Sequence, residues 1–260
     1  MIYDYEWFKK KILDFIGINL NYYKEKQMKR RIESLIKKNG YEGFYDYYNA
    51  ITKDTKLYTE FINYLTINVS EFYRNPNQWE ILEKEVIPYL LKKNPKPKIW
   101  SAACSTGEEP YSLAMLLSKF FPLKDIKIFA TDIDNDAISK AKQGIYVKKS
   151  LESLPPEFIK RYFKAIGELY YISDEIKNCV NFSHHDLLKD EYPKNFDLIV
   201  CRNVLIYFTE EAKDMIYRKF NQSLRMNGIL FVGSTEQIIA SQKYGFKANK
   251  TFFYEKVMEV

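Results

Sequence analysis

The sequence predicts an α/β protein, in which a mainly parallel, doubly wound sheet with a C-terminal antiparallel hairpin follows an all-α domain. Two patterns carry this prediction. Short apolar runs alternate with helical segments over residues 98–260, whereas residues 1–74 show only helical spacing of apolar residues. With 46% hydrophobic residues, the chain can form a sizeable core.

Four segments of the N-terminal domain place apolar residues three or four positions apart, as the buried stripe of a helix requires. They cover residues 5–16, 28–36, 44–51 and 57–65. Asn39-Gly40 ends the second helix, because glycine and asparagine stop helices readily. We therefore expect a helical domain over residues 1–74.

Two proline-containing breaks flank the next segment. Asn75-Pro76-Asn77 interrupts the helical pattern, a helix is expected from Gln78 to Lys92, and Asn94-Pro95-Lys96-Pro97 ends it. We assign residues 75–97 to a linker helix and residues 98–260 to the second domain.

The second domain alternates predicted strands with predicted helices. The strands cover residues 99–103, 126–131, 180–183, 196–201 and 229–233, and the helices cover residues 109–121, 135–144 and 210–224. Asn249-Lys250 separates the two strands of the expected hairpin, over residues 246–248 and 251–257. Residues 147–178 interrupt the alternation with a short helix after Leu154 and a strand over 169–173, so we expect a small inserted subdomain about there.

Charge is unevenly distributed along the chain, whose net charge is +6. Between Asn21 and Gly40, seven basic residues face two acidic ones: Lys24, Lys26, Lys29, Arg30, Arg31, Lys37 and Lys38 against Glu25 and Glu33. Such a patch attracts an acidic partner, although a solvated lysine-rich helix face is the plainer interpretation.

The loop after the first predicted strand is acidic. In open α/β sheets, ligands bind at the carboxyl ends of the strands. The loop from Ala103 to Pro110 has one glycine, no lysine and two carboxylates, Glu108 and Glu109. Two carboxylates repel a pyrophosphate and favour a cationic or hydroxyl-bearing ligand.

Asp132 follows the second predicted strand, where a carboxylate can accept hydrogen bonds from both hydroxyls of a ribose. A helix N-cap is the alternative role, for which Asp134 is the better candidate. These features together indicate a nucleoside-type ligand.

The histidines and cysteines give no metal-site pattern. His184 and His185 are adjacent on a predicted strand and face opposite sides, so they make a poor metal pair. Cys104, Cys179 and Cys201 are far apart, which fits structural roles in a reducing cytoplasm. No apolar run reaches the roughly 20 residues that cross a bilayer, so no membrane insertion is expected.

Four segments in register resemble the bacterial chemotaxis receptor methyltransferase family (the CheR family). They are Thr66–Arg74 (TINVSEFYR), Trp100–Ser112 (WSAACSTGEEPYS), Ala130–Asp134 (ATDID) and Cys201–Phe208 (CRNVLIYF). The resemblance covers nearly the whole chain. It implies a class I methyltransferase-like fold, S-adenosylmethionine as methyl donor, S-adenosylhomocysteine as product, and glutamate side chains of chemotaxis receptors as acceptors.

The resemblance also implies the residues that bind the donor. They are Asn68, Ser70, Arg74, Glu109, Asp132, Asp186, Leu187, Asn203 and Val204. Asp132 would hold the ribose, Glu109 the amino-acid end, Asp186 and Leu187 the adenine, and Asn203 and Val204 the methionine portion. Ser70 replaces a common threonine, and Asp186 stands where asparagine occurs. The roles of Glu108 and Glu109 are not separated by sequence.

Methyl transfer to a carboxylate needs alignment more than acid–base help, because a glutamate of pKa about 4.3 is already ionised near pH 7. We therefore expect no metal, and assign Arg74 and Tyr207 to orienting the acceptor carboxylate. The alternatives are that Arg74 caps a helix, that Tyr207 belongs to the core, and that Asn203 stabilises a turn.

We expect a monomer that docks on acidic receptor helices through its basic helix, residues 21–38, and binds no nucleic acid. A nucleic-acid methyltransferase is one rival, because the patch suits phosphates, but the segment around Asn203 lacks the prolines of amino-methylating enzymes. A non-catalytic receptor-binding module that senses the donor is the other rival. Intact matches count against it, at Arg74, Glu109, Asp132 and Asn203.

Overall fold

The computed structural model describes residues 3–66 and 68–260. Met1 and Ile2 of the expected helical domain, and Ile67 of the segment TINVSEFYR, lie outside the described residues. The chain divides into two compact units. The first comprises Met1–Asn68 and Leu205–Met215, and the second comprises Val69–Val204 and Ile216–Val260.

The first unit contains the four helices that the spacing of apolar residues predicts. They are α1 (Tyr5–Ile16), α2 (Glu25–Lys38), α3 (Phe44–Ile51) and α4 (Thr55–Thr66), with a short 3-10 helix η1 (Leu20–Tyr22) between the first two. Phe8, Ile12, Ile32, Tyr47 and Phe61 are each at most 2% exposed and form the centre of this unit's core. Burial of these stripes is what stabilises helices this short.

A segment far along the sequence completes the first unit. Tyr23 pairs with Phe208 through an isolated antiparallel bridge, and the backbone N–H of Lys24 donates to the carbonyl oxygen of Tyr207 at 2.9 Å. Thr209 N–H donates to the Tyr22 carbonyl at 2.8 Å. The short 3-10 helix η5 (Leu205–Tyr207) therefore belongs to the helical unit, although the sequence places it in the second domain.

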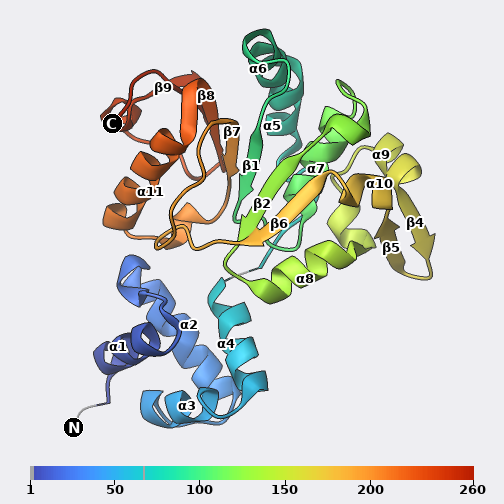
Figure 1. Cartoon of the computed structure of the whole chain (residues 1–260). Helices are drawn as coiled ribbons and strands as arrows, with labels where there is room; N and C mark the ends of the chain where they lie inside the picture. The colour runs from blue at the N-terminus through green and yellow to red at the C-terminus, as the bar shows by residue number, and fades with distance from the viewer. Residues whose placement is uncertain (1–2, 67) are drawn as a thin grey trace. The chain divides into compact units, whose positions relative to one another are not determined.

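The second unit is built on a seven-stranded sheet in the order β6-β2-β1-β7-β8-β10-β9 (Figure 1). The strands are β1 (Ile99–Ala102), β2 (Ile128–Asp132), β6 (Val180–His184), β7 (Phe196–Cys201), β8 (Leu224–Val232), β9 (Phe246–Lys250) and β10 (Phe253–Lys256). The first five pair in parallel, whereas β10 is antiparallel to β8 and to β9. The predicted fold class is confirmed, including the C-terminal hairpin.

Helices cover both faces of the sheet. All four residues of the central strand β1 are therefore buried. Successive strand residues point to opposite faces. On one face, Ile99 belongs to a cluster of buried hydrophobic side chains that the helices between Pro76 and Leu117 help to form. On the other face, the ring of Trp100 contacts that of Phe220, with ring centroids 5.8 Å apart. These helices are α5 (Pro76–Ile81), a π-helical segment (Leu82–Val86), α6 (Ile87–Lys93) and α7 (Glu108–Leu117), with α8 (Asn135–Gln143) and α11 (Glu210–Ser223) completing the cover.

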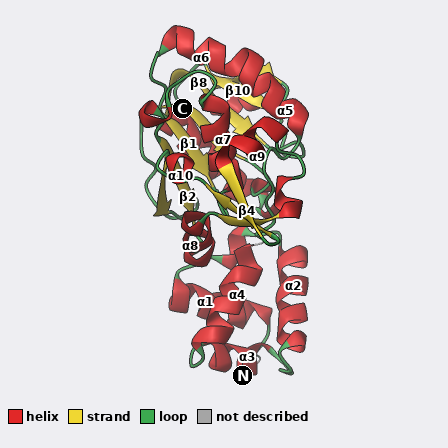
Figure 2. Cartoon of the chain, turned by 90° about the vertical axis from the view of Figure 1, so that its right-hand side faces the viewer, coloured by secondary structure: helices red, strands yellow, loops and turns green. Residues whose placement is uncertain are grey.

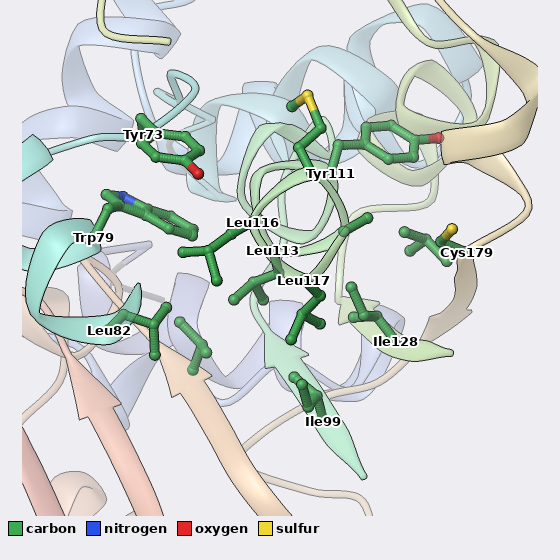
Figure 3. Close-up of a cluster of buried hydrophobic side chains, with 14 of the residues drawn as sticks. Tyr73, Trp79, Leu82, Ile99, Tyr111, Leu113, Leu116, Leu117, Ile128 and Cys179 are labelled. Carbon is green, nitrogen blue, oxygen red and sulfur yellow. The ribbon is translucent and has the colours of Figure 1, made fainter. Parts of the chain in front are cut away.

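The core beneath α7 is shown in Figure 3. Leu113, Leu116 and Leu117 lie between Trp79 and Leu82 on one side and the strand residues Ile99 and Ile128 below and beside them. Figure 2 shows α5 and α7 lying over the strands of the sheet. This packing fixes the position of α7, whose first turn carries Glu108 and Glu109, the two carboxylates that the sequence places in the loop after β1.

The helical segment after the junction differs from the expected helix in two respects. The helix after the junction begins at Pro76 rather than Gln78, because proline suits the first helical position and Asn75, at φ 60°, provides the turn before it. The following π-helical segment, Leu82–Val86, was not expected; Pro88 has no N–H to donate to the carbonyl of Lys84, which loosens the α-helical ladder there.

The inserted region contains a three-stranded antiparallel sheet in the order β3-β5-β4. Its elements are β3 (Ile145–Val147), a 3-10 helix (Lys148–Leu151), α9 (Pro156–Tyr162), β4 (Phe163–Ile166), β5 (Leu169–Ile172) and α10 (Asp174–Lys177). Phe72 anchors this sheet: its N–H donates to the Ser150 carbonyl at 3.0 Å and its ring meets Tyr146 edge-on. Two further 3-10 helices, Leu123–Asp125 and Ser241–Tyr244, lie in the second unit. Across the residues that the structure describes, no helix has both the length and the apolar character needed to span a membrane.

Candidate functional site

Several non-glycine residues with a left-handed backbone lie where the central strands end and in the junction before α5. Ala103 and Ser105, after β1, have φ values of 63° and 48°, and Asn203, after β7, has 61°. Tyr73 and Asn75, in the junction before α5, have 52° and 60°. Non-glycine residues in this region cost about 1 kcal/mol each, and such strain is typical of functional sites. These turns identify the carboxyl edge of the sheet as the candidate site.

Asp132 is buried at the end of β2, and both of its oxygens accept backbone N–H groups. Oδ2 accepts from Ser105 at 2.7 Å, and Oδ1 accepts from Asp134 at 2.9 Å. Asp134 is the N-cap of α8, accepting from Asp136 and Ala137. A carboxylate has about four lone-pair positions, so Asp132 keeps some acceptor capacity for ribose hydroxyls.

Burial raises the pKa of Asp132 to about 6, although the N–H donors of Asp134, Ser105 and Ile133 work against this rise. Near pH 7 this carboxyl is therefore largely ionised in the donor-free protein, with its charge poorly solvated. A ligand that supplies hydroxyl donors satisfies that charge.

Glu108 and Glu109, which the sequence does not separate, have different partners. The Glu108 carboxylate accepts the hydroxyl protons of Thr106, at 2.7 Å, and of Ser70 in the junction. Glu109 accepts from Ser101 Oγ at 2.8 Å. Burial raises the pKa of Glu109 to about 6, with Arg202 opposing the rise. Glu108 thus ties the junction to α7, while Glu109 is the carboxylate with a cationic neighbour.

Arg202 is a buried residue of the site that the sequence analysis missed. Its Nη1 lies 3.7 Å from Glu109 Oε2, and its Nη2 donates to the Arg74 carbonyl at 2.7 Å. It also donates to Asn75 and Gln78, and its guanidinium lies over the ring of Phe231. Its position between Cys201 and Asn203 in CRNVLIYF was the available signal, since a strand-end arginine rarely lies unpaired.

The Arg74 side chain is half-buried and points into the junction. Its Nη1 donates to the carbonyl oxygen of Val69 at 3.2 Å, which is not a helix carbonyl. Burial raises the pKa of Glu109, and the positive charge of Arg74 opposes this rise. Burial lowers the pKa of Arg202, and the charge of Arg74 lowers it further. Arg74, Arg202 and Glu109 are therefore neighbours, and the helix-cap alternative for Arg74 is not what the structure shows.

Asn203 and Val204 follow β7 and are both half-buried. The left-handed backbone of Asn203 makes it part of a turn, as the alternative interpretation expects, and its N–H donates to the carboxylate of Glu236 at 2.6 Å. Glu236, 5% exposed, is a second residue that the sequence analysis missed. Nothing in its local sequence indicates that its partner lies after another strand.

Asp186 and Leu187 follow β6 and are buried. Asp186 Oδ1 accepts from the N–H of Leu188 at 2.8 Å, and its own N–H donates to Asp190. The Leu187 carbonyl accepts from Tyr192 at 2.8 Å. The turn is thus held rigidly beside β2.

Asn68 and Tyr207 belong to the first unit, and each is described there. Asn68 donates to the hydroxyl of Thr66 at 3.1 Å. Tyr207 is half-buried, so it is not a residue of that unit's core. The structure brings together Ser70, Arg74, Glu109, Asp132, Asp186, Leu187, Asn203 and Val204 in one unit.

The donor set of this edge fits a cationic nucleoside. Asp132 and Glu236 are buried carboxylates, Glu109 is a half-buried carboxylate, and Arg202 is the buried cation beside Glu109. Such a set attracts an ammonium or sulfonium group and repels a pyrophosphate. Among the residues that the structure describes, no three His, Cys, Asp or Glu side chains form a group that could hold a metal ion.

A mainly parallel seven-stranded sheet in this order, with antiparallel strands at its C-terminal edge, is the fold of a class I methyltransferase. The comparisons agree. Residues 68–253 match the description "CheR methyltransferase, SAM binding domain", and residues 3–66 match "CheR methyltransferase, all-alpha domain". The chain belongs to the CheR methyltransferase family.

Relatives match over most of their length. A chemotaxis protein methyltransferase of Listeria innocua is 45% identical over 254 residues, covering 97% of each chain. One of Borreliella burgdorferi is 32% identical, covering 88% of this chain and 86% of its own. One of Escherichia coli is 34% identical, covering 85% of this chain and 79% of its own.

Proposed function

We propose that this chain transfers a methyl group from S-adenosylmethionine to glutamate side chains of chemotaxis receptors, giving methyl esters. The observation that carries the proposal is a pair of carboxylates with raised pKa values, the buried Asp132 at the end of β2 and the half-buried Glu109 in the first turn of α7. It is supported by relatives named chemotaxis protein methyltransferase that match over 97% and 88% of the chain.

When bound, S-adenosylmethionine supplies a methyl group on a positively charged sulfur, which is already an activated leaving group. The acceptor carboxylate forms an oxygen–carbon bond as the carbon–sulfur bond breaks, and that bond's electron pair stays on sulfur to leave S-adenosylhomocysteine. No proton has to move. The protein's task is alignment, which supplies several kcal/mol by analogy with effective molarities of oriented groups.

Each site residue has a role in this proposal. Asp132 accepts the ribose hydroxyls and Glu109 binds the ammonium end, since Asp132 is buried, Glu109 is half-buried and both carboxylates have unused acceptor capacity. The remaining donor contacts are assigned to Asn68, Ser70, Arg74, Asp186, Leu187, Asn203 and Val204. Arg74 and Tyr207 orient the acceptor, because a guanidinium can bind both oxygens of a carboxylate.

One assay tests the function. Methyl-labelled donor is offered to receptor-bearing membranes, to RNA and DNA, and to neither. We expect label on the receptor alone. Base should release this label, because base hydrolyses a methyl ester. Label on nucleic acid would instead support a nucleic-acid methyltransferase, and label nowhere would support a donor-sensing module.

We also propose that α2 docks on acidic receptor helices. Its basic residues are not equivalent: Lys38 pairs with Glu60 at 2.7 Å, and Arg31 lies over the Tyr64 ring and donates to the Tyr64 carbonyl. The exposed residues Lys26, Arg30 and Lys37 are spaced i, i+4 and i+11, which puts them on one helix face. The three separate free cysteines fit a cytoplasmic protein, and the monomeric state stays a prediction.

Reversing two charges on this face, with K26E and R30E together, should raise the KM for receptor about tenfold at low salt. Each reversal changes a screened surface interaction by about 0.5–1 kcal/mol. Donor affinity should not change. The matched control is K53E with K56E, two exposed lysines of the same unit outside α2. Equal KM values for both double variants would contradict the docking surface.

Donor binding should weaken as the pH falls below about 6. Asp132 and Glu109 both have a pKa of about 6 in the donor-free protein, and both must be ionised to accept donor hydrogen bonds. The dissociation constant should rise up to about tenfold per pH unit for each group that must lose its proton.

Calorimetry between pH 5 and 8 measures this slope, and D132N should make it shallower by one proton. A rise in pH, which strengthens donor binding, has the opposite effect on the free energy of unfolding. Because the folded-state pKa values are raised, these groups bind more protons in the folded protein, so their contribution to stability falls as pH rises from about 4 to 6. A donor dissociation constant independent of pH would contradict these assignments.

A further inference from the structure

Glu236 connects two loops at the carboxyl edge of the sheet. It lies after β8 and is 5% exposed. Its Oε2 atom accepts the N–H of Asn203 at 2.6 Å and the N–H of Gly233 at 2.9 Å. One carboxylate oxygen therefore joins the residues that follow β7 to those that follow β8.

This bridge begins where the strand ladder stops. The last parallel pair between β7 and β8 is Cys201 with Val232. Beyond it the backbone turns, and a buried N–H needs an acceptor that no strand supplies. Glu236 accepts two such groups, one of them on Asn203, which is held at a φ of 61°. A charged acceptor makes short, strong bonds to N–H groups, and it thereby stabilises this strained turn.

The close approach of the two loops is a second observation. A Cβ atom on Gly233 would lie 2.9 Å from the backbone nitrogen of Asn203 and 3.1 Å from its side-chain nitrogen. It would lie 2.5 Å from the Glu236 carboxylate. Only glycine leaves room for this contact, so the position of Asn203 is defined from the β8 side by Gly233 and Glu236 together.

We infer that Glu236 is a positioning residue of the donor site, which acts by holding Asn203 in the conformation that contacts the methionine portion of the donor. The inference rests on the proposed function, because that function assigns the donor contact to Asn203. In this proposal Glu236 does not contact the donor. Its Oε2 atom accepts two backbone N–H groups, and Asn203 makes the donor contact.

The charge of Glu236 offers a competing explanation. It lies close enough to Glu109 to raise that residue's pKa, so it could act as a negative charge near the donor rather than through Asn203. The two explanations separate cleanly, because both hydrogen bonds go to the same oxygen. In E236Q the amide oxygen can accept both N–H groups while the charge is gone. In E236D the charge remains while the oxygen is withdrawn by one methylene.

The test compares E236A, E236Q, E236D, N203A and the double variant N203A with E236A. Donor dissociation constants are measured by calorimetry, and the KM for donor and kcat are measured at saturating receptor. We expect E236A to raise the donor KM about tenfold while kcat changes less than threefold. E236Q should recover to within about threefold of the parent, and E236D should remain impaired. In the N203A background, E236A should add less than a further threefold loss.

The outcomes distinguish this inference from the proposed function. If N203A leaves donor affinity unchanged, the assignment of Asn203 as a donor contact fails, and the inference fails with it. If N203A weakens donor binding but E236A does not, only the inference is overturned. It is also overturned if E236Q is as impaired as E236A while E236D is not, because charge would then be the cause. Should E236A fold poorly, E236Q and E236D alone decide between position and charge.

Discussion

Replacing Asp132 by alanine should weaken donor binding at least about 100-fold, the largest loss that we expect for any donor-binding variant. The carboxylate is expected to accept two ribose hydroxyls, and each hydrogen bond to a charged group contributes about 1.5–3 kcal/mol. The same oxygens hold the N–H groups of Ser105 and Asp134, so alanine also releases the turn after β1. Calorimetric titration with S-adenosylmethionine measures the loss.

The matched control is D134N, two residues further on. Asp134 accepts from Asp136 and Ala137 as the N-cap of α8, so its replacement should affect stability by no more than about 1 kcal/mol. Donor affinity should stay within about twofold. D132N keeps the shape and should show an intermediate loss. Parent-like donor binding by D132A would remove Asp132 from the site and with it the main support for a nucleoside donor.

Replacing Arg74 by alanine should lower the rate of receptor methylation about 100-fold or more. Removing one partner of a desolvated, hydrogen-bonded charge pair costs about 2–5 kcal/mol, and we expect the partner here to be the acceptor carboxylate. Arg74 is available for this role because Arg202, not Arg74, makes the buried contact with Glu109. The rate is measured with saturating donor and receptor-bearing membranes.

Lysine and phenylalanine variants sharpen this prediction. R74K keeps the charge but loses the two-pronged geometry, so it should recover only part of the rate. Y207F removes one hydroxyl and should cost about tenfold, as the loss of a single hydrogen bond does. R225A, which removes an exposed arginine paired with Asp197, should leave the rate within about twofold. Unchanged rates for both R74A and Y207F would show that neither residue orients the acceptor.

Much of the fold could be predicted from the sequence because the signals are local. Helical spacing in residues 5–16 and 44–51 matches α1 and α3 residue for residue, and the apolar run over 196–201 is β7. A stripe that must be buried has the same period wherever it packs. The π-helical segment at Leu82–Val86 was missed because it comes from the effect of Pro88 on a helix that otherwise reads as regular.

The site could be predicted only in part, for the same reason. Asp132 could be proposed because it ends a predicted strand, and its distinction from the N-cap Asp134 follows from local turn chemistry. Arg202 and Glu236 were missed, since their roles depend on partners far along the chain.

The sequence by itself determined the class of fold, most of the helices and strands, and the family. Each depends on spacing or residue type within a short segment. The tertiary structure alone decided that Glu108 faces Ser70 whereas Glu109 faces Arg202, and that the segment from Leu205 to Met215 joins the helical unit. Those outcomes depend on which distant segments of the chain meet once the sheet is assembled. Contacts between distant segments produce no periodic pattern in the sequence.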